Sequence, residues 1–407
     1  MTEQLKALLA AYGGDAMKLY KATGILLPIA GGAKGYNQTD DLLLETVDGV
    51  PIASLYEEIV ASVNLLNAQR APLIEALSFP VTNPFEEVMP MISEDFEEAD
   101  EFGQPKGIRL GQPWNMGYDL RYMDLGIRYT FRFLGRATAA QIRALNNSAL
   151  EADQRLILQT ILTRVFRNVT DTATLEGSGR AVNVYPFYNG DQTALPAVPP
   201  SWKTNTFTNT HTHYLASGAA TVVSGDLDDA FEHIYHHGYT QGGASVFALV
   251  NRQESRTIRS FRVATGASYD FIPAANTPGS IFLGTLVGSL PSGATPPGAP
   301  STFPGVTGYY GPLTIVEEDY IPAGWMVFIA SGGRFAESNP VGLREHENAA
   351  LKGLKLIPQF ERYPLREAFY HHAIGSGIRH PAAGVVMKVT AGAYSIPTLS
   401  LGGPGGR

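Results

Sequence analysis

Two segments of the chain repeat apolar residues at the spacing of a helix. In residues 54–77, Leu55, Ile59 and Val63 recur at steps of four, which places them on one helical face. Residues 138–167 extend such a pattern further and begin with Thr138 and Gln141 at the spacing of a capping box. About thirty residues at 1.5 Å each predict a rod of roughly 45 Å, longer than most globular helices.

Between these helices the pattern changes to the period of two that is typical of a β-strand. From residue 127 to residue 133, apolar side chains alternate with Arg128, Thr130 and Arg132. An acidic stretch precedes this segment, and a Gly- and Pro-containing turn at residues 102–107 separates the two. Opposite charges on successive segments favour antiparallel pairing. We therefore predict one long β-hairpin over residues 92–134.

The second half of the chain alternates short strands, turns and short helices. The pattern predicts a helix at 226–237, a buried strand at 245–250, and strands at 313–316 and 325–330. Residues 291–304 form a Pro- and Gly-rich segment that we expect to be an exposed loop. Towards the end we expect a strand at 368–374, a break at the glycines of 375–377, a strand at 384–390 and a flexible tail at 402–407. The mixture predicts an α+β fold.

Composition excludes several classes of protein. The chain has 407 residues with a formal net charge of −8 and no cysteine. Without cysteine there is no disulfide framework, thiolate zinc site, iron–sulfur cluster or cysteine nucleophile. Acidity argues against a protein whose main task is gripping phosphates. No apolar run approaches the roughly 18 residues of a membrane helix, and residues 1–24 lack the order of a signal peptide. Charged residues make up 17%, against about 25% in a typical domain, which predicts much surface destined for contact.

Nine histidines raise the possibility of a metal site. The spacings of His211 with His213, and of His233 with His236 and His237, occur in zinc proteins, but no H-E-x-x-H motif is present. We favour structural roles for all of them. His236 and His237 would complement the dipole at a helix C-terminus, and the side chains of His211 and His213 would face solvent. We interpret His371, His372 and His380 in the same way.

The sequence also lacks the signatures of an enzyme. There is no G-x-S-x-G elbow, no P-loop and no complete G-x-G-x-x-G motif. The carboxylates between Glu94 and Glu101 are dense enough to indicate a solvated charge run. Aromatic residues around the predicted hairpin, such as Trp114, Tyr118 and Tyr129, resemble a base-stacking platform, but packing against a protein surface is the favoured interpretation. We predict no catalytic residue, no metal and no cofactor.

The order of these parts, and above all the run from Ala368 through Gly375-Ser376-Gly377 to Val389, resembles the major capsid proteins of tailed bacteriophages with the Hong Kong 97-type fold. The resemblance implies five parts. They are an N-terminal arm with helices (1–91), an extended β-hairpin loop (92–136), a peripheral domain with a spine helix (137–184), an axial domain (185–355), and closing strands with the C-terminal tail (356–407).

In that family the extended loop reaches onto an adjacent subunit, and a long hairpin has too little core to be stable uncovered. The expected contact residues are Glu94, Asp95, Glu97, Glu98, Lys106, Arg109, Trp114, Tyr118, Arg121, Arg128 and Arg132. Some relatives cross-link through a lysine in this loop. For Lys106 we expect instead a solvated turn residue and a shell without covalent links.

The resemblance implies a coat protein that self-assembles, through pentamers and hexamers, into the icosahedral head shell. Its partners would be copies of itself, with scaffold, portal and decoration proteins as further candidates. The shell would enclose double-stranded DNA without reading its sequence. It would be assembled in the host cytoplasm and remain in the virion. Two alternatives are a β-rich hydrolase with a histidine-based metal site and an encapsulin-type compartment, which shares the fold.

Overall fold

A computed structural model describes residues 45–88, 98, 103, 107, 114–176, 178–191, 196, 198–274, 305–358 and 365–399. The chain forms two compact units, one of residues 1–62, 126–148 and 358–369, the other of the remainder. Several predictions lie outside the described residues: the arm before residue 45, most of the turn at 102–107, the loop at 291–304 and the tail at 402–407. No helix in the described ranges is long and apolar enough to cross a bilayer.

The long predicted helix is confirmed as α6 (Ala139–Phe166), whose 28 residues give a length of about 42 Å. Its start is held as the capping box predicts. The Gln141 N–H donates to the Thr138 hydroxyl (3.3 Å), and the Thr138 N–H donates to the Gln141 side chain (3.1 Å). The Asp48 carboxylate also accepts the Ala139 N–H at 3.0 Å. The hydrogen bond from the Thr46 hydroxyl is the main cause that lowers the pKa of Asp48, and the bond from Ala139 adds to the effect.

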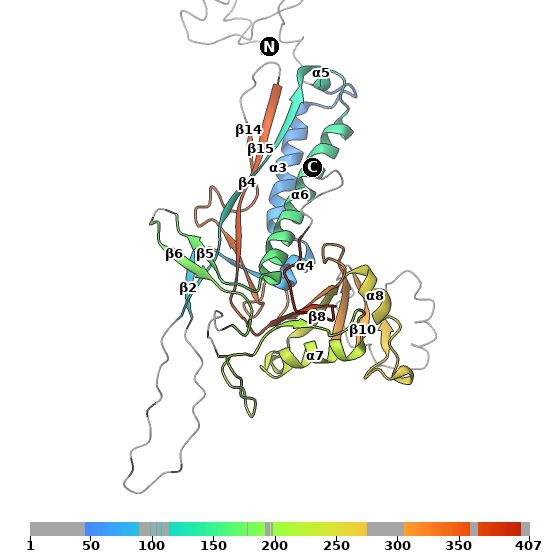
Figure 1. Ribbon diagram of the computed structural model, residues 1–407. Helices are drawn as coiled ribbons and strands as arrows, with labels where there is room; N and C mark the ends of the chain where they lie inside the picture. Colours follow the sequence, from blue (N-terminus) through green and yellow to red (C-terminus); the bar gives the residue numbers. More distant parts are fainter. Residues whose placement is uncertain are drawn as a thin grey trace, which may run out of the picture. The chain divides into compact units, whose positions relative to one another are not determined.

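The predicted helix 54–77 is two helices, α3 (Ile52–Ala68) and α4 (Pro72–Leu77). The break lies at Ala71, whose backbone is extended (φ −57°, ψ 137°), because a residue preceding proline avoids the helical region. Figure 1 shows α3 and α6 running side by side. In the first unit they share a small core of Leu55, Leu134, Ala137, Ala139 and Ile142.

A seven-stranded sheet dominates the second unit. Its strands, in spatial order, are β7 (Tyr214–Ala216), β16 (Gly384–Lys388), β12 (Trp325–Ser331), β8 (Ser245–Val250), β11 (Leu313–Glu317), β10 (Val306–Tyr310) and β9 (Phe271–Pro273). Alternate residues face opposite sides. Leu249 and Val327 join a core with the second half of α6, whereas Ala248 and Phe328 join a core with α7 (Ser224–Tyr235). Both faces are covered, which explains the nearly continuous apolar runs of β8 and β12.

The predicted elements of this sheet are largely confirmed. Strands β8, β11, β12 and β16 agree with their predictions within two residues. Helix α8 (Arg252–Ile258) begins where Asn251 accepts the Gln253 N–H. Two short 3₁₀ turns, η2 (Tyr239–Gly242) and η3 (Val263–Thr265), complete this part. In Figure 1, α7 lies against the opposite face of the sheet from α6.

The second sheet has five strands: β1 (Ser78–Val81), β13 (Val341–Glu345), β15 (Leu365–Ile378), β14 (Lys355–Pro358) and β4 (Arg121–Thr130), which pairs with β15. The predicted break at residues 375–377 is wrong, because β15 continues through it. Gly375 pairs with Arg344, and Gly377 with Gly342. These glycines give room for a neighbouring backbone, described below, and do not end the strand.

The single hairpin predicted over residues 92–134 is also wrong in its pairing. The described part of the ladder joins β2 (Phe85–Val88) to β3 (Trp114–Gly117), so the pairing begins before residue 92. Strand β4 pairs with β15 and not with the acidic segment, and the chain is helical at α5 (Phe131–Leu134). The alternation of apolar and polar residues correctly indicates a strand at β4, but the strand that pairs with it is β15. A second small ladder joins β5 (Asp171–Thr174) to β6 (Ala181–Val184).

Candidate functional site

The described residues on either side of segment 89–113 are paired with each other in the second unit, and we call this place the loop root (residues 84–88 and 114–120). Val88 pairs with Trp114 at the outer end of the β2–β3 ladder, and Phe85 pairs with Gly117 at the inner end. The ladder is short, and a two-stranded ribbon is marginally stable by itself. The loop root therefore depends on the surfaces that it touches.

One such surface is the β5–β6 ladder. A Cβ atom added to Gly117 would lie 2.7 Å from a methyl carbon of Val182 and 2.8 Å from the carbonyl oxygen of Asn183, so glycine is needed for this approach. Phe85 packs against the small core of that ladder, and the guanidinium of Arg180 lies 5.2 Å from its ring centre.

A second surface is the glycine-containing part of β13 and β15. The ring of Tyr118 lies against Gly342 and Gly377, where an added Cβ would come within 2.3 and 2.7 Å of it. Arg344 donates to the Tyr118 carbonyl oxygen (2.9 Å). At Gly375 an added Cβ would be 1.7 Å from the carbonyl oxygen of Asp119. The backbone of the loop root is thus seated directly on the backbone of β15.

Tyr118 forms the hydrophobic centre of the loop root. It is 1% exposed and packs with Phe79 and Val81. Burial is the main cause that raises the pKa of its hydroxyl, and the nearby Glu86 carboxylate adds to the effect. Because Tyr118 is buried in its own subunit, its predicted place on the contact surface is wrong. It anchors the loop from within.

Charged side chains hold the edge of the loop root. Arg379 of the turn after β15 lies 3.1 Å from the Glu86 carboxylate, and its guanidinium also covers the ring of Phe79. Arg121, a predicted contact residue, is exposed and pairs with Asp119 at 3.0 Å. A polar cavity of about 230 Å³ adjoins this pair and is lined by Arg164, whose pKa is lowered by burial.

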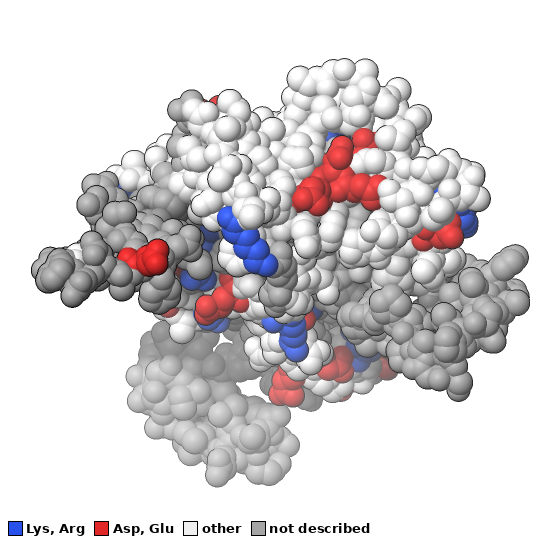
Figure 2. Space-filling model, turned by 90° about the horizontal axis from the view of Figure 1, so that it is seen from below, with Lys and Arg blue, Asp and Glu red and all other residues white. Residues whose placement is uncertain are grey.

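The remaining predicted contact residues divide into two groups. Arg128, Arg132 and Glu98 are exposed on the described surface. The structure does not describe Glu94, Asp95, Glu97, Lys106 or Arg109, nor the side chain of Trp114. Tyr129 stacks on Phe133 (5.8 Å between ring centres) beside the core of the first unit, as the packing interpretation predicts. On the face drawn in Figure 2, most of the described surface carries no charged side chain, which matches the low charge content.

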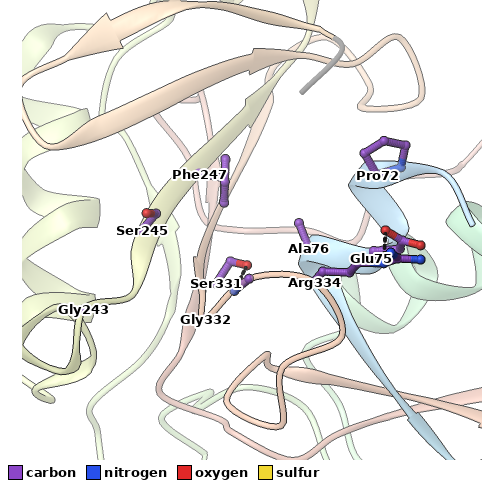
Figure 3. A pocket seen from close by; sticks show the side chains of 10 residues that line it. Pro72, Glu75, Ala76, Gly243, Ser245, Phe247, Ser331, Gly332 and Arg334 are labelled. Carbon is purple, nitrogen blue, oxygen red and sulfur yellow. Dashed lines mark hydrogen bonds and ion pairs between the residues drawn. The ribbon is translucent and has the colours of Figure 1, made fainter. Parts of the chain in front are cut away.

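A pocket of about 420 Å³ opens between α4, β8 and the turn after β12 (Figure 3). Its carboxylate, Glu75, is paired with Arg334 at 2.8 Å and also accepts the Arg70 N–H. Its Ser331 hydroxyl accepts the Gly333 N–H at 3.1 Å. The Ser331 hydroxyl also donates to the Asn339 side-chain oxygen at 3.3 Å, so both polar groups are engaged within the chain.

The histidines differ from the sequence prediction. His213 is completely buried, so the expectation that it faces solvent is wrong. Its backbone is fixed between two neighbours, since its N–H donates to Tyr188 (2.7 Å) and its carbonyl accepts from Val386 (2.8 Å). The fold brings His211 and His213 to the end of α7, where His236 and His237 lie. Sequence spacing hinted at each pair, but gave no sign that the pairs meet.

Several solved structures are similar to this chain. A structure titled Mycobacterium phage Patience is 38% identical to this chain with a TM-score of 0.63, over 88% of this chain and 94% of that one. Weaker likenesses are the capsid of an empty GTA particle (14% identity, TM-score 0.45, covering 79% and 90%) and the procapsid of satellite phage P4 with its size determination protein (14%, 0.40, covering 86% and 94%). No protein-family model and no curated protein matches the chain. The first likeness is close and long enough to show the family.

Proposed function

The chain belongs to the major capsid proteins of tailed bacteriophages with the Hong Kong 97-type fold, and we propose that its loop root is the device that joins neighbouring subunits. The protein is a structural component of the virion that assembles with copies of itself into the icosahedral head shell. The observation that carries the proposal is the seating of Tyr118 and Asp119 on the glycines of β13 and β15.

A loop that grips an adjacent subunit transmits force to its own subunit only through its two ends. Here both ends meet at one ladder, which is held by the β5–β6 ladder on one side and by β13 and β15 on the other. Because the backbone atoms of the loop root are in direct contact with those of its neighbours, they cannot move towards them without steric overlap, and the loop root is rigid. Segment 89–113 would then extend to a neighbour within a pentamer or hexamer.

We further propose a purely structural role, with the five-part division given above. The described pocket supports this, because its carboxylate is already paired with Arg334. Interiors of such shells would hold double-stranded DNA without base-specific contacts, in keeping with the acidic charge of −8. Scaffold, portal and decoration proteins would join in the host cytoplasm. The hydrolase and encapsulin alternatives have less support.

The first test is closed assembly. The purified chain, alone or with the scaffold of its phage, is expected to form uniform closed shells in electron micrographs, because heterologous contacts that close by rotation generate rings of five and six. Light scattering gives the mass in parallel. Particles no larger than tetramers under every assembly condition would refute the proposal.

The second test concerns the charges of β4 and α5. Arg128→Glu combined with Arg132→Glu is expected to block assembly, because two exposed cations that face carboxylates of the same or an adjacent chain would become anions facing anions. Arg128→Ala alone is expected to weaken assembly only slightly, since an exposed pair contributes about 0–1 kcal/mol.

The matched control is Arg252→Glu with Arg256→Glu on α8, two exposed residues outside the loop and the spine. It changes the net charge by the same amount. Shell yield is measured by sedimentation at several salt concentrations. Normal shells from the variant with both Arg128 and Arg132 reversed would contradict the proposed pairing. An equal loss of shell yield in this variant and in the control would also contradict it, because the loss would then come from net charge alone.

A further inference from the structure

We propose that His211, His213, His236 and His237 form a tetrahedral site for a divalent transition-metal ion, with Zn²⁺ as the expected occupant. The ligating atoms of all four lie within 4.8 Å of one another. This inference depends on the geometry of the second unit alone. It holds or fails independently of the role of the loop root.

Four of the six separations between the ring nitrogens are close to those of a coordination shell, and all six are at most 4.8 Å. The Nε2 atoms of His211, His213 and His237 form a nearly equilateral triangle with sides of 3.2, 3.1 and 3.1 Å. The Nε2 atom of His236 lies 3.4 Å from that of His211. Four nitrogens bonded at about 2.0–2.1 Å to a tetrahedral Zn²⁺ are about 3.3–3.4 Å apart. A square-planar ion would instead impose two unequal sets of separations.

Hydrogen bonding among the rings cannot explain this triangle. A neutral imidazole presents either one N–H or one lone pair at Nε2, directed along a single line, so each nitrogen serves one partner. For His213 the choice is fixed. Its Nδ1 lies 2.7 Å from the carbonyl oxygen of Gly384, which can only accept, so Nδ1 carries the proton and Nε2 presents a lone pair to the cluster. A cation at the centre satisfies all the nitrogens at once.

The surroundings are those of a metal site as well. A ligating histidine usually donates its other N–H to a carbonyl or carboxylate, as His213 does to Gly384. Phe207 stacks on His237 with 4.1 Å between ring centres, and Tyr188 also stacks on His237 at 5.9 Å, so aromatic rings line the site.

The ligand set also indicates the kind of site. Nitrogen donors favour zinc, copper, iron and nickel over Mg²⁺ or Ca²⁺, which require oxygen. Four protein ligands close the tetrahedron and leave no open position for substrate or water, as in structural and not catalytic zinc sites. The ion would fasten the segment before β7 to the C-terminal end of α7. Its expected effect is stabilisation of the subunit, because it binds the folded state alone.

The test uses the full chain without a histidine tag, stripped with chelator and then titrated with Zn²⁺. We expect one Zn²⁺ per subunit by mass spectrometry of the metal content, and intense visible bands when Co²⁺ replaces it, as a tetrahedral site gives. His211→Ala with His236→Ala, both only partly buried in the wild type, is expected to weaken binding by at least about 100-fold and abolish the bands.

The control is His233→Ala. His233 stacks on His211, but its Nδ1 is bonded to the carbonyl oxygen of Asp229 and it is not one of the four ligands. This variant should keep full binding. Hydrogen exchange of the wild type provides a measurement that needs no variant, and residues 208–214 and 235–238 should gain protection on adding Zn²⁺ but not Mg²⁺. Absence of binding to the wild type, unchanged binding by the double variant, or no gain in protection would each overturn the proposal.

Discussion

Replacing Asp153 by alanine is expected to lower the free energy of unfolding of the subunit by about 3–5 kcal/mol, the usual cost of leaving a buried charge without its partner. Asp153 lies in α6 and is 5% exposed. One of its oxygens accepts from Arg70 at 2.9 Å, and the other is 2.5 Å from Nδ1 of His372. In the variant the guanidinium of Arg70, which is 4% exposed, would keep its hydrogen bond to the Asn67 side chain at 3.1 Å and the longer contact with Glu345 at 3.5 Å.

The measurement is urea unfolding of the unassembled subunit, followed by tryptophan fluorescence. Arg143→Ala is the matched control, because it removes another ion pair made by α6. Arg143 binds Glu58 at 2.8 and 3.0 Å, but the two side chains are 45% and 51% exposed. Solvent screens such a pair, so the urea midpoint should hardly change. If the two variants unfolded at similar urea concentrations, burial of the ion pair would not determine how much stability its loss removes.

Replacing Gly375 by alanine is expected to abolish assembly. The added Cβ would lie 1.7 Å from the carbonyl oxygen and 2.4 Å from the carbonyl carbon of Asp119, which are backbone atoms that no side-chain rotation can move aside. The loop root would have to leave its seat on β15. Shells should therefore be absent in electron micrographs. Amide hydrogens of residues 114–120 should exchange faster, while those of β8 stay protected.

Gly225→Ala is the control for this substitution. Gly225 lies in the first turn of α7, and an added Cβ there meets nothing within 4 Å. Because alanine is favoured over glycine in a helix by roughly 0.5–1 kcal/mol, this variant should assemble normally and be slightly more stable. Wild-type shells from Gly375→Ala, with residues 114–120 still protected, would disprove the role given to the loop root.

Local patterns predicted the elements that depend on local forces. The bounds of α6 differ from the prediction by one residue at each end, because capping by Thr138 and Gln141 and the spacing of apolar residues act within a few residues. The buried strands β8 and β12 were found for a similar reason, since an apolar run between turns fits a covered sheet. Pro72 also indicates locally that the helix is interrupted, and the prediction of one helix over 54–77 does not take this into account.

Errors arose wherever the partner of a segment was distant in the sequence. The alternation of β4 specifies a strand but does not name β15 as its neighbour. The glycines at 375 and 377 predict a break by their local sequence, but in the fold they admit the backbone of residues 117–119. Tyr118 was placed on a contact surface because aromatic residues favour interfaces, yet it is buried in its own subunit.

The sequence by itself determined the class of the protein, its long helix, its buried strands and, through the order of its parts, its family. These follow from periodicity, capping and composition, which act between near neighbours. Only the tertiary structure decided where the loop is anchored and which histidines meet. His213 and His237 are 24 residues apart, and no local force brings their nitrogens to 3.1 Å. That distance results from the packing of α7 against one face of the seven-stranded sheet, which sums many weak contacts.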